Sequence, residues 1–164
     1  MKAGAQRIWL VLAVVAALFA AWRIYGQMQA EGLAESDPHA ALRWRPHDPT
    51  ALLALAELQL QEGDTKAAGA TARELLAAEP LAGRGFRVLA DVADREGRRE
   101  DALKLYEIAA RRAPRDLATR AWLTQRYLER GDFAGALGQV DRILRMAPQR
   151  ARSINPVLAQ LAQD

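Results

Sequence analysis

The segment Gly97-Arg98-Arg99-Glu100-Asp101-Ala102 is followed by Pro114, seventeen residues after its glycine. The same arrangement occurs 34 residues earlier, in Gly63-Asp64-Thr65-Lys66-Ala67-Ala68 with Pro80, and 34 residues later, in Gly131-Asp132-Phe133-Ala134-Gly135-Ala136 with Pro148. A further proline, Pro46, falls on the same grid. A fixed period of this size is typical of helical solenoids, in which each unit buries its apolar face by stacking on its neighbours.

Each of these junctions predicts the end of one helix and the start of the next. A glycine such as Gly97 can adopt the left-handed conformation that ends a helix, and Asp64 or Asp132 can cap the following helix through its carboxylate. The alanine one turn later permits close approach of two helices, and the proline ends the second helix. Gly83 and Gly85 are expected to weaken the start of a helix and to make that junction flexible.

Apolar residues recur at intervals of three and four throughout residues 49–150, as in amphipathic helices, and no alternating strand pattern competes with them. On these residues the chain resembles the tetratricopeptide repeat family. The small-residue, glycine, alanine, aromatic and proline positions of that motif are matched by Ala56 and Ala90, by Gly63, Gly97 and Gly131, by Ala68, Ala102 and Ala136, by Tyr106, and by Pro80, Pro114 and Pro148. Gln59, Arg120 and Thr124 depart from the motif and leave the local packing around them open.

The resemblance implies an all-α fold, with three repeats at residues 49–82, 83–116 and 117–150. A tether and a degenerate half-repeat (26–48) precede the three repeats, and a capping helix (151–164) follows them, since terminal repeats of such arrays are atypical.

Residues 1–25 are predicted to form a transmembrane helix. Ile8 to Trp22 is an unbroken apolar run, and residues 8–25 would span about 27 Å as a helix, close to the thickness of a bilayer core. A cleaved signal peptide and a soluble helix are the alternatives. Lys2 and Arg7 favour a cytoplasmic N-terminus. The expected location is a single-pass protein of the inner membrane, with the repeats in the periplasm or otherwise outside the cytoplasm.

The charge of the chain argues against a nucleic acid partner. The formal net charge is +3, and Lys2, Arg7 and Arg23 account for all of it. The remainder is neutral but polarised, with a net charge of −5 over residues 26–79 and +5 over residues 80–164.

Residues with catalytic or metal-binding chemistry are scarce. The chain has two histidines, His39 and His47, both in a polar connector without converging ligands, and no phosphate-binding glycine loop. We therefore expect no enzymatic activity, no cofactor and no metal.

In this repeat architecture the first helix of each unit lines a concave groove. The residues predicted to bind a partner there are Arg84, Arg87, Asp91, Arg95, Gln125, Arg152 and Asn155, with Thr50, Leu53, Glu57, Ala121 and Leu128 along the same groove. Arg84 and Arg87 share a helical face and could hold a carboxylate. Alternatively, they are solvated or paired with Asp91 and Asp94. The lysines and asparagines with which some relatives bind peptide C-termini are not matched.

Two functions follow as hypotheses. The first is a membrane-anchored adaptor or assembly factor that binds a protein or peptide, embedded in the membrane or exported, through the groove. The second is a structural subunit of a membrane complex, such as cytochrome c maturation, polysaccharide or pilus machinery. In that case the alanine-rich face of the span would pack against partner helices.

Overall fold

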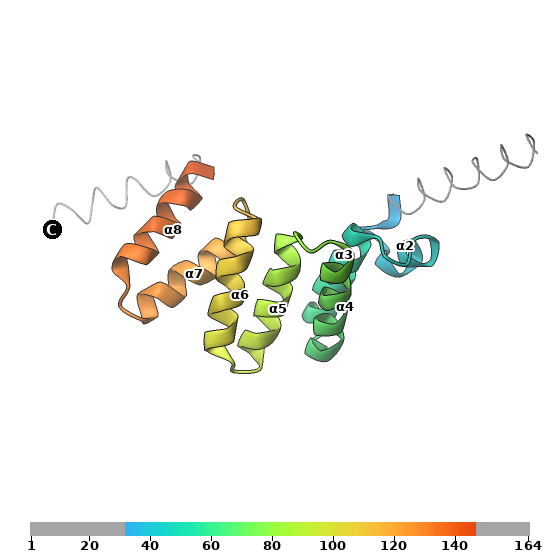
Figure 1. Ribbon diagram of the computed structural model, residues 1–164, viewed down its shortest axis with the longest axis horizontal. Helices are drawn as coiled ribbons and strands as arrows, with labels where there is room; N and C mark the ends of the chain where they lie inside the picture. Colours follow the sequence, from blue (N-terminus) through green and yellow to red (C-terminus); the bar gives the residue numbers. More distant parts are fainter. Residues whose placement is uncertain (1–31, 147–164) are drawn as a thin grey trace, which may run out of the picture.

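The computed structural model describes residues 32–146, and within this range every regular element is an α-helix (Figure 1). The helices are α2 (Pro38–Trp44), α3 (Pro49–Gln61), α4 (Thr65–Ala78), α5 (Gly83–Arg95), α6 (Arg99–Arg112), α7 (Leu117–Glu129) and α8 (Phe133–Met146). The all-α class is therefore confirmed for this range. None of these helices combines the length and apolar character needed to cross a bilayer. The predicted span at residues 8–25 and the predicted capping helix at 151–164 lie outside the described residues.

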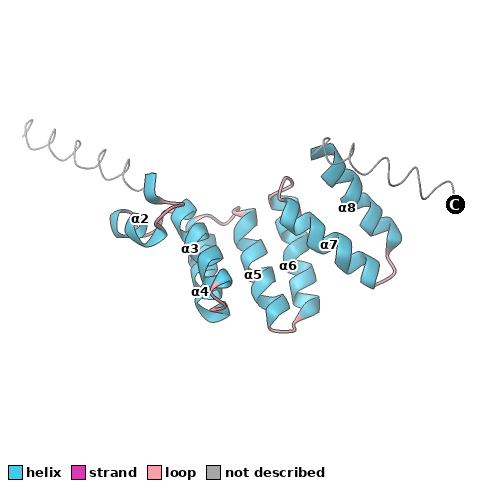
Figure 2. Cartoon of the chain, turned by 180° about the vertical axis from the view of Figure 1, so that it is seen from behind, coloured by secondary structure: helices cyan, strands magenta, loops and turns pink. Residues whose placement is uncertain are grey.

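Three antiparallel helix pairs, α3–α4, α5–α6 and α7–α8, follow one another along the array (Figures 1 and 2). Their first helices begin at Pro49, Gly83 and Leu117, so the step between pairs is the 34 residues of the sequence period. Within each pair the connection contains a glycine with a positive φ, namely Gly63, Gly97 or Gly131. The prediction that these glycines end helices is confirmed.

Two of the predicted caps are also present. The Asp64 carboxylate accepts a hydrogen bond from the backbone N–H of Ala67 at 2.8 Å, and the Asp132 carboxylate accepts one from Gly135 at 2.8 Å. At the corresponding position of the middle pair, Arg98 makes no such cap. Its guanidinium instead donates to Glu96 and Asp101.

Small residues form the contacts inside and between the pairs. Ala68, Ala102 and Ala136 are buried, as their place in the repeat predicts. The middle cluster joins Ala90 and Ala93 of α5, Ala102 and Tyr106 of α6 and Leu123 of α7, together with Leu103 and Ala110. Because the alanines occupy little volume, the helix axes approach closely, and larger side chains fill the space between successive pairs.

Gly83 and Gly85 were expected to make the start of α5 flexible, but in the structure they allow close packing there. Both glycines are buried, and a Cβ added to Gly83 would lie 2.6 Å from the backbone nitrogen of Ala113. A Cβ on Gly85 would meet Leu75 and Leu76 at 3.1 Å. The missing side chains thus let the start of α5 pack against α4 and against the end of α6.

Polar pairs occupy two of the three positions that depart from the repeat motif, and the third, Thr124, donates to the Arg120 carbonyl oxygen of its own helix. Arg120 is 4% exposed, and its guanidinium donates to Gln139 Oε1 at 2.7 Å and to the carbonyl oxygens of Ala110 and Pro114 at 3.0 and 3.2 Å. The hydroxyl of Thr71 donates to Gln59 Oε1 at 2.9 Å. Arg120 and Gln59 are therefore matched by a polar partner on the neighbouring helix, which removes the cost of burying them unpaired.

Candidate protein-interaction groove

The residues predicted to line the groove come from the first helices of the three pairs. Glu57 lies on α3; Arg84, Arg87, Asp91 and Arg95 lie on α5; and Gln125 lies on α7. We call the surface formed by these residues, together with Thr50 and Leu53 of α3, the groove face. Arg152 and Asn155 belong to the prediction as well, but they lie outside the described residues.

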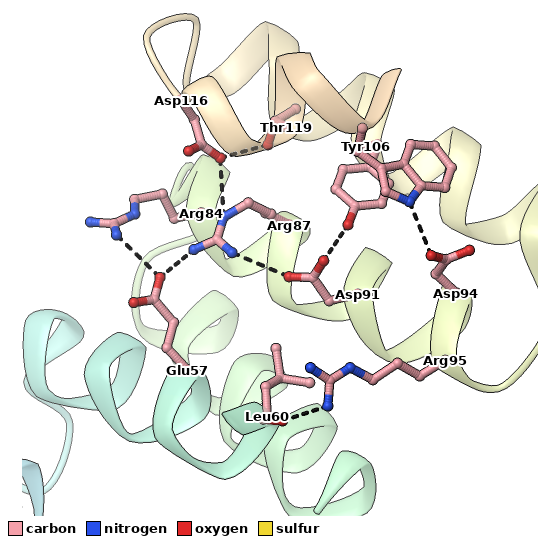
Figure 3. A network of polar contacts seen from close by, with 11 residues as sticks. Glu57, Leu60, Arg84, Arg87, Asp91, Asp94, Arg95, Tyr106, Asp116 and Thr119 are labelled. Carbon is pink, nitrogen blue, oxygen red and sulfur yellow. Dashed lines mark hydrogen bonds and ion pairs between the residues drawn. The ribbon is translucent and has the colours of Figure 1, made fainter. Parts of the chain in front are cut away.

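Arg87 is the centre of an ion network on the groove face (Figure 3). Its guanidinium pairs with Glu57 of α3, with Asp91 of α5 at 3.2 Å, and with Asp116, the residue before α7, at 3.1 Å. The Arg87 side chain is 13% exposed. One guanidinium therefore links α3, α5 and the residue before α7. Its contacts to Glu57 and Asp91 are charge-assisted hydrogen bonds, and its contact to Asp116 is an ion pair.

Asp91 extends this network towards α6. It accepts a hydrogen bond from the hydroxyl of Tyr106, whose ring stacks on that of Trp122 of α7 at a centroid distance of 4.0 Å. Burial raises the pKa of the Asp91 carboxyl above its ordinary value, although the Tyr106 hydrogen bond and the Arg87 charge oppose the shift. Burial and the bond to Asp91 likewise raise the pKa of the Tyr106 phenol far above its usual range, so it remains a donor at neutral pH.

Two further polar contacts fasten α5 to its neighbours in the same view (Figure 3). The indole N–H of Trp122 donates to the Asp94 carboxylate at 3.0 Å, and the Arg95 guanidinium donates to the carbonyl oxygen of Leu60 on α3. Asp94, which the sequence suggested as a partner for the arginines, binds a tryptophan instead. Arg95 thus donates to a carbonyl group in the last turn of α3, where such groups lack an i+4 partner within the helix.

Arg84 differs from Arg87 in being accessible. Its side chain is 54% exposed and has one ion-pair partner, Glu57, at 3.2 Å. It stands at the rim of a hollow of about 410 Å³ that lies along α3. The hollow is lined by Thr50, Leu53, Ala54, Glu57, Leu58, Gln61 and Arg84, and by Glu35, Ser36 and Pro38 at the start of the described chain.

Gln125 lies in a second, smaller hollow of about 210 Å³ near the other end of the groove face. Its neighbours there are Trp122, Arg126 and Glu129 of α7, with Asp94 and Arg99. The Gln125 amide donates to Glu129 at 3.1 Å, and Arg126 pairs with the same carboxylate at 3.0 Å. The residues of α7 in this hollow stand 68 positions after Ala54, Glu57, Leu58 and Gln61 in the first, so the two hollows occupy equivalent sites two repeats apart.

The structure thus brings Arg84, Arg87 and Asp91 of the predicted set together through Glu57, but not as a free arginine pair, whereas Arg95 and Gln125 make separate contacts. The pairing of Arg87 with Asp91, one of the alternatives open at the level of sequence, is present, and Glu57 and Asp116 add to it. The sequence did not indicate Asp116 as a partner, because it follows the connector Pro114-Arg115 and reads as an ordinary helix-capping residue. The sequence also did not indicate that Glu35 and Ser36 would line the first hollow.

No group of three or more potential metal ligands occurs within residues 32–146. No protein-family model matches the chain, and no curated protein matches it. Among solved structures, a crystal structure of MamA is similar with a TM-score of 0.56 at 16% identity, covering 70% of this chain and 67% of that one. A second MamA crystal structure gives a TM-score of 0.52 at 16% identity, covering 75% and 67%. With the 34-residue step and the helix pairs described above, these similarities identify the fold as a helical repeat of the tetratricopeptide type.

Proposed function

We propose that this protein is a non-enzymatic interaction scaffold that binds a segment of a partner protein on its groove face. The observation that carries the proposal is the hollow along α3, whose lining combines the apolar residues Leu53, Ala54 and Leu58 with polar groups such as Thr50, Gln61 and Arg84. A concave site of this composition suits a peptide, whose side chains fill the apolar part while the polar groups fix its orientation.

The Arg87 ion network supports this function because it fixes the arrangement of the helices that form the groove face in the unbound protein. It ties α3, α5 and the start of α7 to one guanidinium that is only 13% exposed, so the groove face is organised in the absence of a ligand. Preorganisation of this kind lowers the entropic cost of binding. Because Arg87 already has three carboxylate partners, the groups offered to a ligand are Arg84, Thr50 and Gln61 rather than a pair of free arginines.

We further propose that residues 8–25 anchor the scaffold in the inner membrane, with the repeats outside the cytoplasm. The apolar run from Ile8 to Trp22 and the flanking Lys2 and Arg7 support this orientation. The second candidate function, a structural subunit of a membrane complex, rests on the small-residue face of the same segment, formed by Ala13, Ala16, Ala17, Ala20 and Ala21.

Co-purification in detergent, with mass spectrometry of the captured proteins, tests the groove. The test variant is Thr50→Arg/Gln61→Arg, which fills the hollow from two exposed positions without touching the ion network. Ala134→Arg/Gly138→Arg adds the same two side chains to the exposed face of α8 and is the matched control.

A partner that is lost with the groove variant and kept with the α8 variant supports the scaffold. A partner that survives the groove variant but is lost when residues 8–25 are exchanged for an unrelated span contradicts the scaffold and favours the structural subunit.

A further inference from the structure

The two edges of the repeat array carry opposite charge. We define the start edge as the connections between successive pairs together with the flanking helix turns, residues 41–52, 75–86, 109–120 and 143–146. The turn edge contains the connections within pairs and their flanking turns, residues 58–68, 92–102 and 126–136. In Figure 1 the start edge runs along the upper margin of the array and the turn edge along the lower margin.

The start edge is basic. It contains eight arginines and three carboxylates, a formal excess of five positive charges, whereas the turn edge contains six basic and eight acidic residues. The arginines of the start edge are Arg43, Arg45, Arg84, Arg111, Arg112, Arg115, Arg120 and Arg145, of which only Arg120 is buried.

Ion pairs offset part of this charge. Asp48 is 5% exposed, accepts hydrogen bonds from two backbone N–H groups at the start of α3 and pairs with Arg45 at 3.1 Å, and Asp116 is paired with Arg87. Glu79 is the exposed acid of the three. Arg84 and Arg145 pair with Glu57 and Asp141, which lie outside the start edge, whereas no ion pair is present at Arg43, Arg111, Arg112 and Arg115 within the described residues. Leu81, which is 68% exposed, adds an apolar side chain to the same edge.

The described chain also begins at this edge. Ala34 packs against Ala41 and against Ala51 in the first turn of α3. Six residues, 26–31, separate residue 32 from the apolar segment 8–25. Even a fully extended chain of six residues reaches only about 20 Å. If residues 8–25 span a bilayer, as proposed above, one end of the start edge is therefore held close to the headgroups.

We propose that the start edge rests on the anionic headgroups of the membrane surface, so that the groove face is presented at a fixed height and orientation above it. The charge complementarity selects an anionic lipid surface. The short connection to residues 8–25 favours lipid over a nucleic acid, the other polyanion that an arginine-rich edge could bind. This inference rests on the proposed anchor but not on the identity of the partner bound in the groove.

The chain contains no cysteine, so a single spin label can be placed on each edge of the full-length protein. Leu81→Cys marks the start edge, and Phe133→Cys is a matched control on the turn edge, since the two side chains are 68% and 66% exposed. The labelled proteins are reconstituted in vesicles of phosphatidylcholine, with or without phosphatidylglycerol, that contain a nickel-chelating lipid as a relaxing agent at headgroup level.

We expect the label at position 81 to relax severalfold faster than the label at position 133 in vesicles with phosphatidylglycerol. The difference should shrink without the anionic lipid and in Arg111→Gln/Arg115→Gln, whose arginines are exposed. Lys66→Gln/Arg99→Gln removes two cations from the turn edge and should leave the difference unchanged.

Equal relaxation at the two positions would overturn the proposal, as would protection of the label at position 81 by a single-stranded RNA oligonucleotide instead of lipid. Failure of the protein to float with the vesicles would also overturn it, together with the anchor. Capture of a partner by the groove would be unaffected by any of these results, so the two proposals fail separately.

Discussion

Replacing Arg87 with methionine tests whether the groove face depends on one largely buried cation. Methionine preserves the length and the apolar stem of the side chain but removes the partner of Glu57, Asp91 and Asp116. Removing one member of a buried ion pair costs about 3–5 kcal/mol, because the remaining charges stay buried without compensation.

Two features of the structure place the expected loss at the lower end of this range. The three carboxylates are 27%, 26% and 15% exposed, so water can reach them in part, and Glu57 keeps its contact with Arg84. We expect the free energy of unfolding to fall by about 3 kcal/mol. At about 4 °C per kcal/mol for a domain of this size, the melting temperature should fall by about 10–15 °C.

Thermal and urea unfolding of the full-length protein in detergent, followed by circular dichroism, measure this loss. The control is Arg84→Met, on the same helix and with the same acid partner, but 54% exposed with a single ion pair. It should cost less than about 1 kcal/mol. The Arg87 charge lowers the pKa of Asp91, so its removal should raise that pKa further. The deficit of Arg87→Met should therefore shrink as the pH falls and Asp91 is protonated. Equal losses for the two variants, or a deficit that persists unchanged in acid, would refute the reasoning.

Three further changes address packing and titration. Ala102→Arg places a long charged side chain at a fully buried position and should cost more than about 4 kcal/mol; an unchanged melting curve would contradict the interhelix contact. Gly83→Ala should destabilise by about 1–3 kcal/mol because its Cβ has no room, whereas Gly138→Ala, with nothing within 4 Å of its Cβ, should stabilise by about 0.5–1 kcal/mol in the same urea titration. Tyr106→Phe should raise the pKa of Asp91 further, since it removes a hydrogen bond that lowers it. Because that pKa is already raised on folding, ionisation of Asp91 opposes folding, and the penalty is relieved as the pH falls through the raised pKa. A carbon-13 NMR titration of the carboxyl group that showed a lower pKa in the variant would contradict this assignment.

Local sequence signals predicted the repeat well, because they act within a few residues. The glycines at 63, 97 and 131 have the positive φ expected of helix ends, and Asp64 caps the next helix. Ala102 is buried, as its one-turn offset from Gly97 suggests. Each of these features is decided by the backbone within one turn, which is why a single sequence suffices to recognise it.

The polar partners of the groove could not be predicted in the same way. Glu57 and Arg87 are 30 residues apart and belong to different repeats, so their contact depends on the exact stacking of the pairs. The partners of Arg120 could not be predicted either. The sequence shows a charged residue at a normally apolar position, but it does not reveal that Gln139 and two carbonyl groups accept its hydrogen bonds. Such contacts between distant residues depend on side-chain geometry rather than on the repeat period or on helix propensity.

The three-way contact of Arg87 has a mechanical consequence. In a solenoid each repeat contacts only its neighbours, so the array can bend at one interface between repeats without affecting the next. Here the first repeat and the start of the third are tied to the same guanidinium in the second. Opening the interface between the first and second repeats, or between the second and third, would displace the same guanidinium and so strain the other interface. We therefore expect the array to resist bending as one rigid unit. A load applied at one end of the described chain would then be transmitted to the far end instead of being absorbed at the first hinge.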